Sequence, residues 1–317
     1  MSTPIPYREE TIRFGPEERL IGTLTLPLQA PSQPRPGLIL MNAGALSRLG
    51  PHRLNVELAR TAAAQGASAI RIDLPGLGDS GFSNSPLSHD EQAFAAIQQA
   101  MTLLADTPGG PREFVIAGLC SGAEVGFLLA QRDARITGLF MIEPYYYPNR
   151  FSGMLRSIRR VREYGLRRAV RRVIQRLRGF RNHPGQADAP PPMPAAAADE
   201  GSLPAPSPQD FADGLSLLLQ RGVRIRMIYA NTLMGQYDLR HHHRHIFRQL
   251  GDSTHFDVEL VPHTDHVFTR VEARRVLIRR LAAWLQQFGY DGDTPPAAAP
   301  QLSAPRAVPA ATVAQRQ

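Results

Sequence analysis

Short apolar segments alternate with longer segments of helical spacing along most of this 317-residue chain. Most of the short segments are continuous apolar runs, which is typical of parallel strands buried on both faces. Strands are expected at residues 11–15, 22–28, 37–44, 68–74, 112–120, 136–144, 223–230 and 255–262, the first two as an antiparallel hairpin or meander. Helices are expected at 54–66, 88–104, 121–132, 211–222, 242–251 and 270–289. The alternation predicts an α/β fold with a mostly parallel central sheet and helices on both faces.

Two segments interrupt this pattern and define the expected organisation of the chain. Residues 149–208 combine an Arg-rich stretch, whose apolar residues have helical spacing, with a linker rich in Pro and Ala. We interpret this segment as a helical cap inserted into the core, which leaves residues 1–148 and 209–290 as the two parts of that core. Residues 291–317 are again rich in Pro and Ala and are expected to form a disordered tail.

Composition excludes several classes of protein and of chemistry. The single cysteine rules out a disulfide framework within the chain, which is typical of a reducing compartment. The first residues lack the apolar segment of a signal peptide, and no apolar run approaches the ~18 residues of a membrane-spanning helix. All Lys and Arg positions are arginines, so no lysine can form a Schiff base or complete a phosphate loop. We therefore expect a cytoplasmic protein without a transmembrane segment.

The most informative motif is Gly118-Leu119-Cys120-Ser121-Gly122, which lies between a predicted strand and a predicted helix. A Gly-x-nucleophile-x-Gly turn in this position is typical of a nucleophile elbow. The nucleophile has a strained backbone there, and side chains two residues before or after it would collide with the neighbouring strand and helix. Cys120 has glycines at both places, whereas Ser121 would have Leu119 at one of them. We predict Cys120 as the nucleophile; Ser121 is the alternative nucleophile, and a simple buried position is the alternative role for Cys120.

Three segments carry a resemblance to a known superfamily. GLILMNAGALSRLGPHR, IRIDLPGLGDSG and GLCSGA resemble the α/β-hydrolase superfamily, over about residues 8–290 apart from the insertion. Within it, they are similar to the serine-aminopeptidase-like and lysophospholipase-like hydrolases. The Cys elbow is similar to that of dienelactone hydrolases and polyhydroxyalkanoate synthases. The resemblance implies an α/β-hydrolase fold but leaves the reaction open, because one of the last two families hydrolyses and the other transfers acyl groups.

The resemblance also implies that nucleophile, acid and histidine follow in that order along the chain. The loop before the last helix contains His263 and His266, and the sequence around His266 resembles the catalytic histidine loop of the family. Asp238 is the only carboxylate in the loop after strand 223–230, which makes it the candidate acid, although it could instead cap a helix. Glu143, at the end of the preceding strand, is an alternative acid. A Cys–His pair without an acid is the third arrangement.

The oxyanion hole is expected to combine two backbone N–H groups. One is the N–H of Ser121, directly after the nucleophile. The other comes from the loop after strand 37–44, where Gly44 is the first candidate and Ala43 the second. Small residues at these positions allow the backbone to approach the substrate closely.

These residues predict an acyl hydrolase of the esterase or thioesterase type. It would form a covalent acyl intermediate on Cys120, use His266 as the general base, and need no cofactor and no metal. The substrate would be a small-molecule ester or thioester. An acyltransferase with a thiol, amine or hydroxyl acceptor could use the same intermediate. A catalytically inactive scaffold that binds a partner is the third hypothesis.

The Arg-rich part of the predicted cap, residues 154–178, leaves three interpretations open. It could be a lid over the acyl pocket with a solvated outer face. It could dock an acidic carrier protein, a coenzyme A thioester or another phosphate-bearing substrate. It could also bind a membrane surface. Nucleic acid is not expected as a partner, because no recognisable nucleic-acid-binding fold accompanies the charge.

Overall fold

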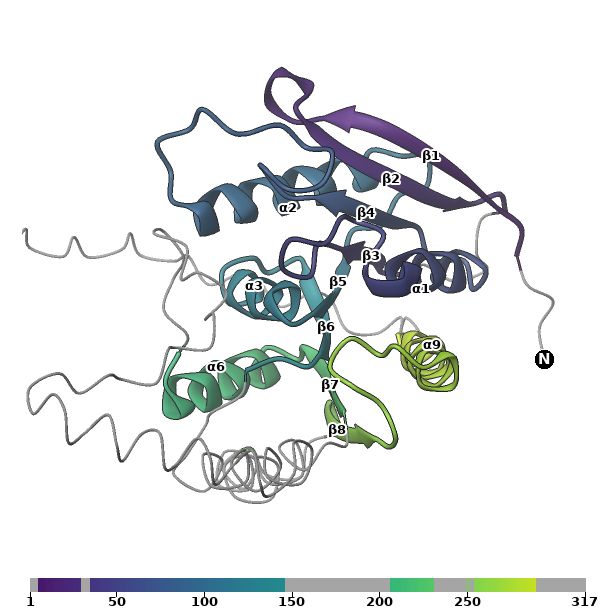
Figure 1. Ribbon diagram of the computed structural model, residues 1–317, viewed down its shortest axis with the longest axis vertical. Helices are drawn as coiled ribbons and strands as arrows, with labels where there is room; N and C mark the ends of the chain where they lie inside the picture. The colour runs from purple at the N-terminus through teal and green to yellow at the C-terminus, as the bar shows by residue number, and fades with distance from the viewer. Residues whose placement is uncertain (1–4, 30–34, 146–205, 231–249, 251–253, 289–317) are drawn as a thin grey trace, which may run out of the picture.

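The predicted α/β-hydrolase fold is confirmed by the computed structural model, in which one sheet of eight strands carries helices on both faces (Figure 1). The structure describes residues 5–29, 35–145, 206–230, 250 and 254–288. The predicted cap at 149–208, apart from residues 206–208, lies outside the described residues, as do Asp238 and the predicted tail at 291–317.

The strand order of the sheet is β1-β2-β4-β3-β5-β6-β7-β8. The strands are β1 (Tyr7–Phe14), β2 (Leu20–Pro27), β3 (Gly37–Leu40), β4 (Ala69–Asp73), β5 (Phe114–Leu119), β6 (Ile136–Ile142), β7 (Arg224–Ala230) and β8 (Phe256–Val261). β1 and β2 are antiparallel, and β2 is antiparallel to β4, whereas β3 to β8 all run parallel to one another. The carboxyl ends of the parallel strands therefore share one edge of the sheet, where ligands of such folds usually bind.

The helices divide between the two faces of the sheet. They are α1 (Leu54–Ala63), α2 (His89–Ala105), α3 (Ser121–Ala130), α6 (Pro208–Gln220) and α9 (Val271–Leu285), with short 3-10 turns at Pro16–Glu18 and Pro51–Arg53. α2, α3 and α6 pack on one face, and α1 and α9 pack on the other (Figure 1). Successive residues of β3 contribute to opposite cores: Leu38 and Leu40 to one, Ile39 to the other. This two-sided burial explains why the central strands are continuous apolar runs.

The start of α6 marks the return of the chain to the core. Ser207 accepts the backbone N–H of Asp210, and the Asp210 carboxylate accepts the backbone N–H of Ser207 in return. Pro208 occupies the first helical position, where no N–H is needed. No helix among the described residues is long and apolar enough to cross a membrane.

Candidate active site

Cys120 is the single residue between β5 and α3, and its backbone has the strained conformation expected of an elbow. Its φ is 54° and its ψ is −122°, a region that residues other than glycine seldom occupy. A Cβ on Gly118 would lie 2.3 Å from the carbonyl carbon of Gly122, and a Cβ on Gly122 would lie 2.7 Å from the carbonyl oxygen of Asn42. Ser121 lies in the first turn of α3 instead. The geometry therefore has the register that the glycine spacing predicts for Cys120.

His266 lies in the loop between β8 and α9, and its interaction with the Cys120 side chain raises its pKa. Its Nδ1 lies 2.9 Å from Oε2 of Glu143. The His266 side chain is 47% exposed, so the imidazole lies at the mouth of the site. His263, the other histidine of this loop, is exposed. The structure thus brings Cys120, His266 and Glu143 together in one row, with a hydrogen bond between His266 and Glu143.

Glu143 directly follows β6 and is held beside the elbow by the backbone. The N–H of Cys120 donates to the carbonyl of Ile142 at 2.9 Å, and the N–H of Glu143 donates to the carbonyl of Ile228 at 2.8 Å. The second carboxylate oxygen of Glu143 accepts the N–H of Ala230. The side chain of Glu143 is 2% exposed. The backbone φ of this residue is 51°. The sequence predicted Glu143 only as an alternative to Asp238 for the acid. Asp238 itself lies outside the described residues.

The two neighbours of His266 change its proton affinity. The interaction with Cys120, and then the hydrogen bond to Glu143, raise the pKa of His266 to about 10, against the opposing effect of burial. A protonated imidazole is therefore favoured at neutral pH. Glu124, in the first turn of α3, is a carboxyl near this centre that the sequence did not single out. Burial raises the pKa of Glu124, and the charge of His266 opposes that rise.

The loop after β3 brings the predicted oxyanion donors together. The N–H of Gly44 donates to Oγ of Ser121 at 2.8 Å, so the two residues are neighbours although 77 positions separate them. Gly44 has a φ of 55°, and a Cβ there would meet no atom within 4 Å. Glycine is therefore favoured at this position by backbone conformation rather than by space. Ala43, the second candidate, is buried.

Buried polar side chains hold this loop in place. The amide of Asn42 donates to the carbonyl of Leu46 at 2.7 Å and to Asp73 at 2.9 Å, and its oxygen accepts the N–H of Leu74 at 2.7 Å. The guanidinium of Arg48 lies 2.6 Å from the buried carboxylate of Asp73. Asn42 and Arg48, on either side of Gly44, therefore both connect this loop to Asp73 at the end of β4.

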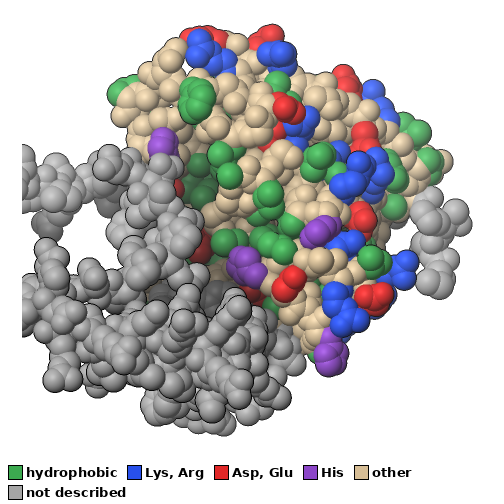
Figure 2. All heavy atoms as spheres, viewed as in Figure 1, with side chains coloured by type: hydrophobic (Ala, Val, Ile, Leu, Met, Phe, Trp, Pro, Cys, Tyr) green, Lys and Arg blue, Asp and Glu red, His purple; other side chains and the backbone are tan. Residues whose placement is uncertain are grey.

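The surroundings of the site are partly apolar. Leu46 is among the large hydrophobic side chains that are exposed, and it belongs to the same loop as Gly44. Figure 2 shows hydrophobic side chains gathered near the middle of this face of the molecule. Within the described part of the chain, no group of three His, Cys, Asp or Glu side chains could hold a metal ion.

The fold has relatives of known structure that differ widely in sequence. A protein of Klebsiella pneumoniae subsp. pneumoniae MGH 78578, provisionally classed as a dienelactone hydrolase, has a TM-score of 0.56 at 15% identity, over 89% of this chain and 100% of that chain. The dienelactone hydrolase of Anabaena variabilis ATCC 29413 has a TM-score of 0.51 at 13% identity, over 89% and 99%. The esterase domain of a Rhodothermus marinus protein has a TM-score of 0.51 at 14% identity, over 89% and 99%. At these identities the likeness concerns the fold alone.

The sequence itself carries the family assignment. No curated protein sequence matches this chain. The model of the alpha/beta hydrolase family matches residues 44–280, which is more than half of the chain and extends from the loop after β3, through the elbow, into α9. The chain therefore belongs to the alpha/beta hydrolase family.

Proposed function

We propose that this protein is an acyl hydrolase of the esterase or thioesterase type that works through an acyl-Cys120 intermediate. The observation that carries the proposal is the row Cys120–His266–Glu143 at a strained elbow, with His266 hydrogen-bonded to Glu143. A nucleophile, a histidine and a group that orients the histidine are the parts that covalent acyl transfer requires. A binding scaffold without catalytic activity would not require these three side chains to lie together, so the row argues against that hypothesis.

The first half of the reaction would acylate Cys120. The sulfur of Cys120 attacks the carbonyl carbon of the ester or thioester as a thiolate, the nucleophilic form of cysteine, with the proton on His266. Negative charge then develops on the carbonyl oxygen. The N–H groups of Ser121 and Gly44 can stabilise this charge, provided that the Gly44 N–H exchanges the Ser121 hydroxyl for the substrate oxygen. His266 gives its proton to the leaving alkoxide or thiolate as the carbonyl forms again.

The second half would release the acid. His266, now neutral, takes a proton from water as the water oxygen attacks the thioester carbonyl. The sulfur of Cys120 leaves as a thiolate, which restores the starting pair with His266. An amine, alcohol or thiol in place of water would give acyl transfer instead, by the same steps.

We also propose Glu143, rather than Asp238, as the positioning carboxylate of the site. Glu143 already occupies the hydrogen-bonding place at Nδ1 of His266, which leaves Nε2 for the sulfur and the substrate. A buried carboxylate there fixes the ring orientation and stabilises the imidazolium without accepting the proton itself. The docking of an acidic carrier protein or a coenzyme A thioester on the Arg-rich segment 154–178 remains a prediction from the sequence.

The proposal is tested by intact-protein mass spectrometry after mixing the full chain with a panel of acyl thioesters and activated esters. Wild type is expected to gain the mass of one acyl group at Cys120 and to lose it with time, while Cys120→Ala gains none. Loss of the adduct in water alone supports a hydrolase. Loss only after an amine, alcohol or thiol is added supports the transferase. An adduct that forms equally on Cys120→Ala would contradict the proposal.

A further inference from the structure

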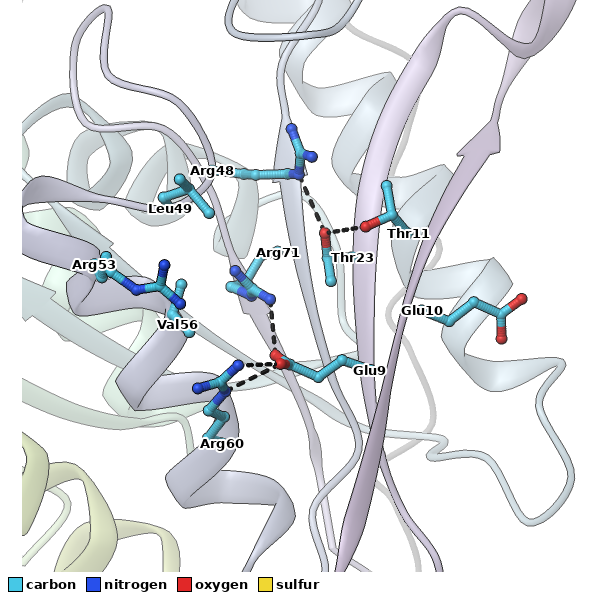
Figure 3. Close-up of a pocket in the computed structure, with 10 residues that line it drawn as sticks. All are labelled: Glu9, Glu10, Thr11, Thr23, Arg48, Leu49, Arg53, Val56, Arg60 and Arg71. Atoms are coloured by element: carbon cyan, nitrogen blue, oxygen red, sulfur yellow. Dashed lines mark hydrogen bonds and ion pairs between the residues drawn. The ribbon is translucent and has the colours of Figure 1, made fainter.

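A small polar cavity lies where α1 approaches the antiparallel edge of the sheet, and none of its lining residues belongs to the row at Cys120 (Figure 3). Its volume is about 240 Å³. Strands β1, β2 and β4 line it on one side, and α1 with the segment before it lines the other. Four arginines contribute to its wall, namely Arg48, Arg53, Arg60 and Arg71.

The floor of the cavity is a row of polar residues on the sheet. Thr11 of β1 lies opposite Thr23 of β2, and Thr23 lies opposite Arg71 of β4. Arg71 is only 3% exposed, and arginine seldom lies so deep unless it is paired. Its Nε has no hydrogen-bond partner among the described residues. The middle of the sheet therefore holds a buried cation that its surroundings satisfy only in part.

One carboxylate, that of Glu9, pairs with two of the guanidinium groups in this cavity. Oε1 of Glu9 lies 2.9 Å from Arg71, and Oε2 of Glu9 accepts Nε of Arg60 at 3.0 Å. Arg53 makes no ion pair with a described residue, and Figure 3 shows its guanidinium pointing toward Arg60 and Arg71. Burial, followed by repulsion from Arg60, lowers the pKa of Arg71. Against the single charge of Glu9, these three side chains leave two positive charges in excess.

The other charges at the cavity do not remove this excess. Arg48 lies 2.6 Å from each of Asp73 and Asp79, two carboxylates that do not line the cavity. Glu10 points away from the guanidinium groups in Figure 3, and its charge lies 3.9 Å from that of Arg8. The four arginines and two glutamates that line the cavity therefore leave two positive charges in excess.

The backbone supports the arrangement of Arg53. Its φ of 63° places it in the left-handed region directly before α1, and His52 beside it has a φ of 51°. Two successive residues other than glycine in this region represent strain that the surrounding structure has to maintain. Such strain is frequent where a protein positions a side chain for binding.

We propose that this cavity binds the phosphate group of a small molecule between Arg53, Arg60 and Arg71. A phosphate monoester carries a charge of about −1.5 to −2 at neutral pH, which matches the excess of two positive charges. Guanidinium groups bind phosphate oxygens in a planar, two-pronged geometry. Drug-sized ligands occupy clefts of about 300–1,000 Å³, so 240 Å³ suits one phosphate group rather than an entire metabolite.

Arg48 connects this cavity with the loop of the proposed oxyanion hole. Its Nε donates to Thr23 on the cavity floor at 3.2 Å, and it lies four positions after Gly44 in the sequence. The phosphate could therefore belong to the acyl substrate, which rests on the proposed function, or to a separate small anion. The expected contacts at the cavity are the same for both sources, because each presents a phosphate group to the arginines.

Calorimetric titration of the full chain with inorganic phosphate, at constant ionic strength, tests the site. Arg53→Gln is expected to weaken binding at least about tenfold, because one charged donor is lost. Glu9→Gln is expected to strengthen it, because a carboxylate no longer competes for Arg60 and Arg71. Arg279→Gln, a change at an exposed arginine of α9, is the matched control and should leave binding unchanged. A purely structural ion-pair network would not bind more tightly after Glu9→Gln.

The inference is overturned if wild type does not bind phosphate, if acetate binds equally well, or if Arg53→Gln and Glu9→Gln both bind phosphate as wild type does. Turnover of an acyl thioester of coenzyme A, compared with the same acyl group on phosphate-free N-acetylcysteamine, separates the two sources. If Arg53→Gln has a higher KM than wild type for the coenzyme A thioester alone, the phosphate belongs to the substrate. If the variant and wild type have equal KM values for both thioesters, the phosphate belongs to a separate anion. The calorimetric titration tests phosphate binding at the cavity even if neither thioester is a substrate.

Discussion

At the scale of single residues, the site depends on how Cys120 and Glu143 surround the imidazole of His266. Cys120 has the strained backbone of an elbow, and His266 contacts it from a loop that follows β8. Glu143 lies almost fully buried behind the ring. Removing a charged partner from a buried site leaves the other partner uncompensated, so each of the three side chains is expected to affect the others.

The first prediction concerns the register of the elbow. Cys120→Ala should lower kcat/KM by several orders of magnitude, as the loss of a nucleophile does in other enzymes. Ser121→Ala should lower it by less than about tenfold, because alanine keeps the backbone N–H and releases the N–H of Gly44 from the hydroxyl. Steady-state kinetics on the best substrate of the panel measures both variants. Normal turnover by Cys120→Ala together with an inactive Ser121→Ala would place the nucleophile one residue later.

The second prediction concerns the proton on His266. Glu143→Gln should lower the pKa of His266 from about 10, because a neutral amide no longer stabilises the imidazolium. The imidazolium is the form that protonates the leaving group, so the alkaline limb of the kcat/KM profile should move to lower pH in the same variant. NMR titration of the imidazole gives the pKa directly.

Asp265→Asn is the matched control for that titration. Asp265 is adjacent to His266 in sequence, but its carboxylate accepts the N–H of Thr269 at 2.9 Å rather than a ring N–H. The pKa of His266 should therefore change little in the control. An equal fall in both variants would mean that general charge, and not the Glu143 hydrogen bond, raises this pKa.

At the scale of elements, the close approach of β5 to α3 defines the elbow. The strand ends at Leu119 and the helix begins at Ser121, so the chain reverses its direction over one residue. Such a turn requires the backbones on either side to nearly touch. Gly118 and Gly122 permit this contact because neither has a side chain.

A third prediction follows from this contact. Gly118→Ala should destabilise the protein by about 3 kcal/mol or more, because its Cβ would meet backbone atoms of Gly122, which cannot rotate away as a side chain can. Gly109→Ala is the comparison: its φ is 69°, but no atom lies within 4 Å of the added Cβ, so only the backbone cost of about 1–2 kcal/mol applies. Urea denaturation gives both values. Equal losses of stability would refute the steric argument.

At the scale of the whole molecule, strand order brings distant segments to one edge of the sheet. β5 lies between β3 and β6, so the elbow has the loop of Gly44 on one side and Glu143 on the other. β7 and β8 follow in order and place the loop of His266 nearby. The relative positions of the site residues therefore depend on the strand order of the sheet. The C-terminal segment, by contrast, is expected to contribute little to stability.

The fourth prediction concerns that C-terminal segment. Residues 292–317 contain few large apolar side chains, so they offer little apolar surface for burial against the core. Their deletion should leave the Tm within experimental error, as measured by calorimetry on the full and shortened chains. A fall of several degrees would show that the segment packs on the core.

Local patterns in the sequence were sufficient for the fold class and for the register of the elbow. Apolar runs and helical spacing repeat within a few residues, so the alternation of strands and helices could be recognised and is confirmed by the family and the sheet. The glycines around Cys120 could likewise be interpreted locally, because the contact they permit joins residues four positions apart. His266 was identified only through its resemblance to a family loop.

The partners of these residues were decided by the tertiary structure. Glu143 meets His266 across 123 positions, and Glu9 meets Arg71 across 62. No periodicity extends that far, because such pairs depend on which strands are neighbours and on where each strand ends. A carboxylate after β6 and one after β7 look equivalent in the sequence. They differ only once the sheet places the end of β6 beside the elbow and within hydrogen-bonding distance of the imidazole.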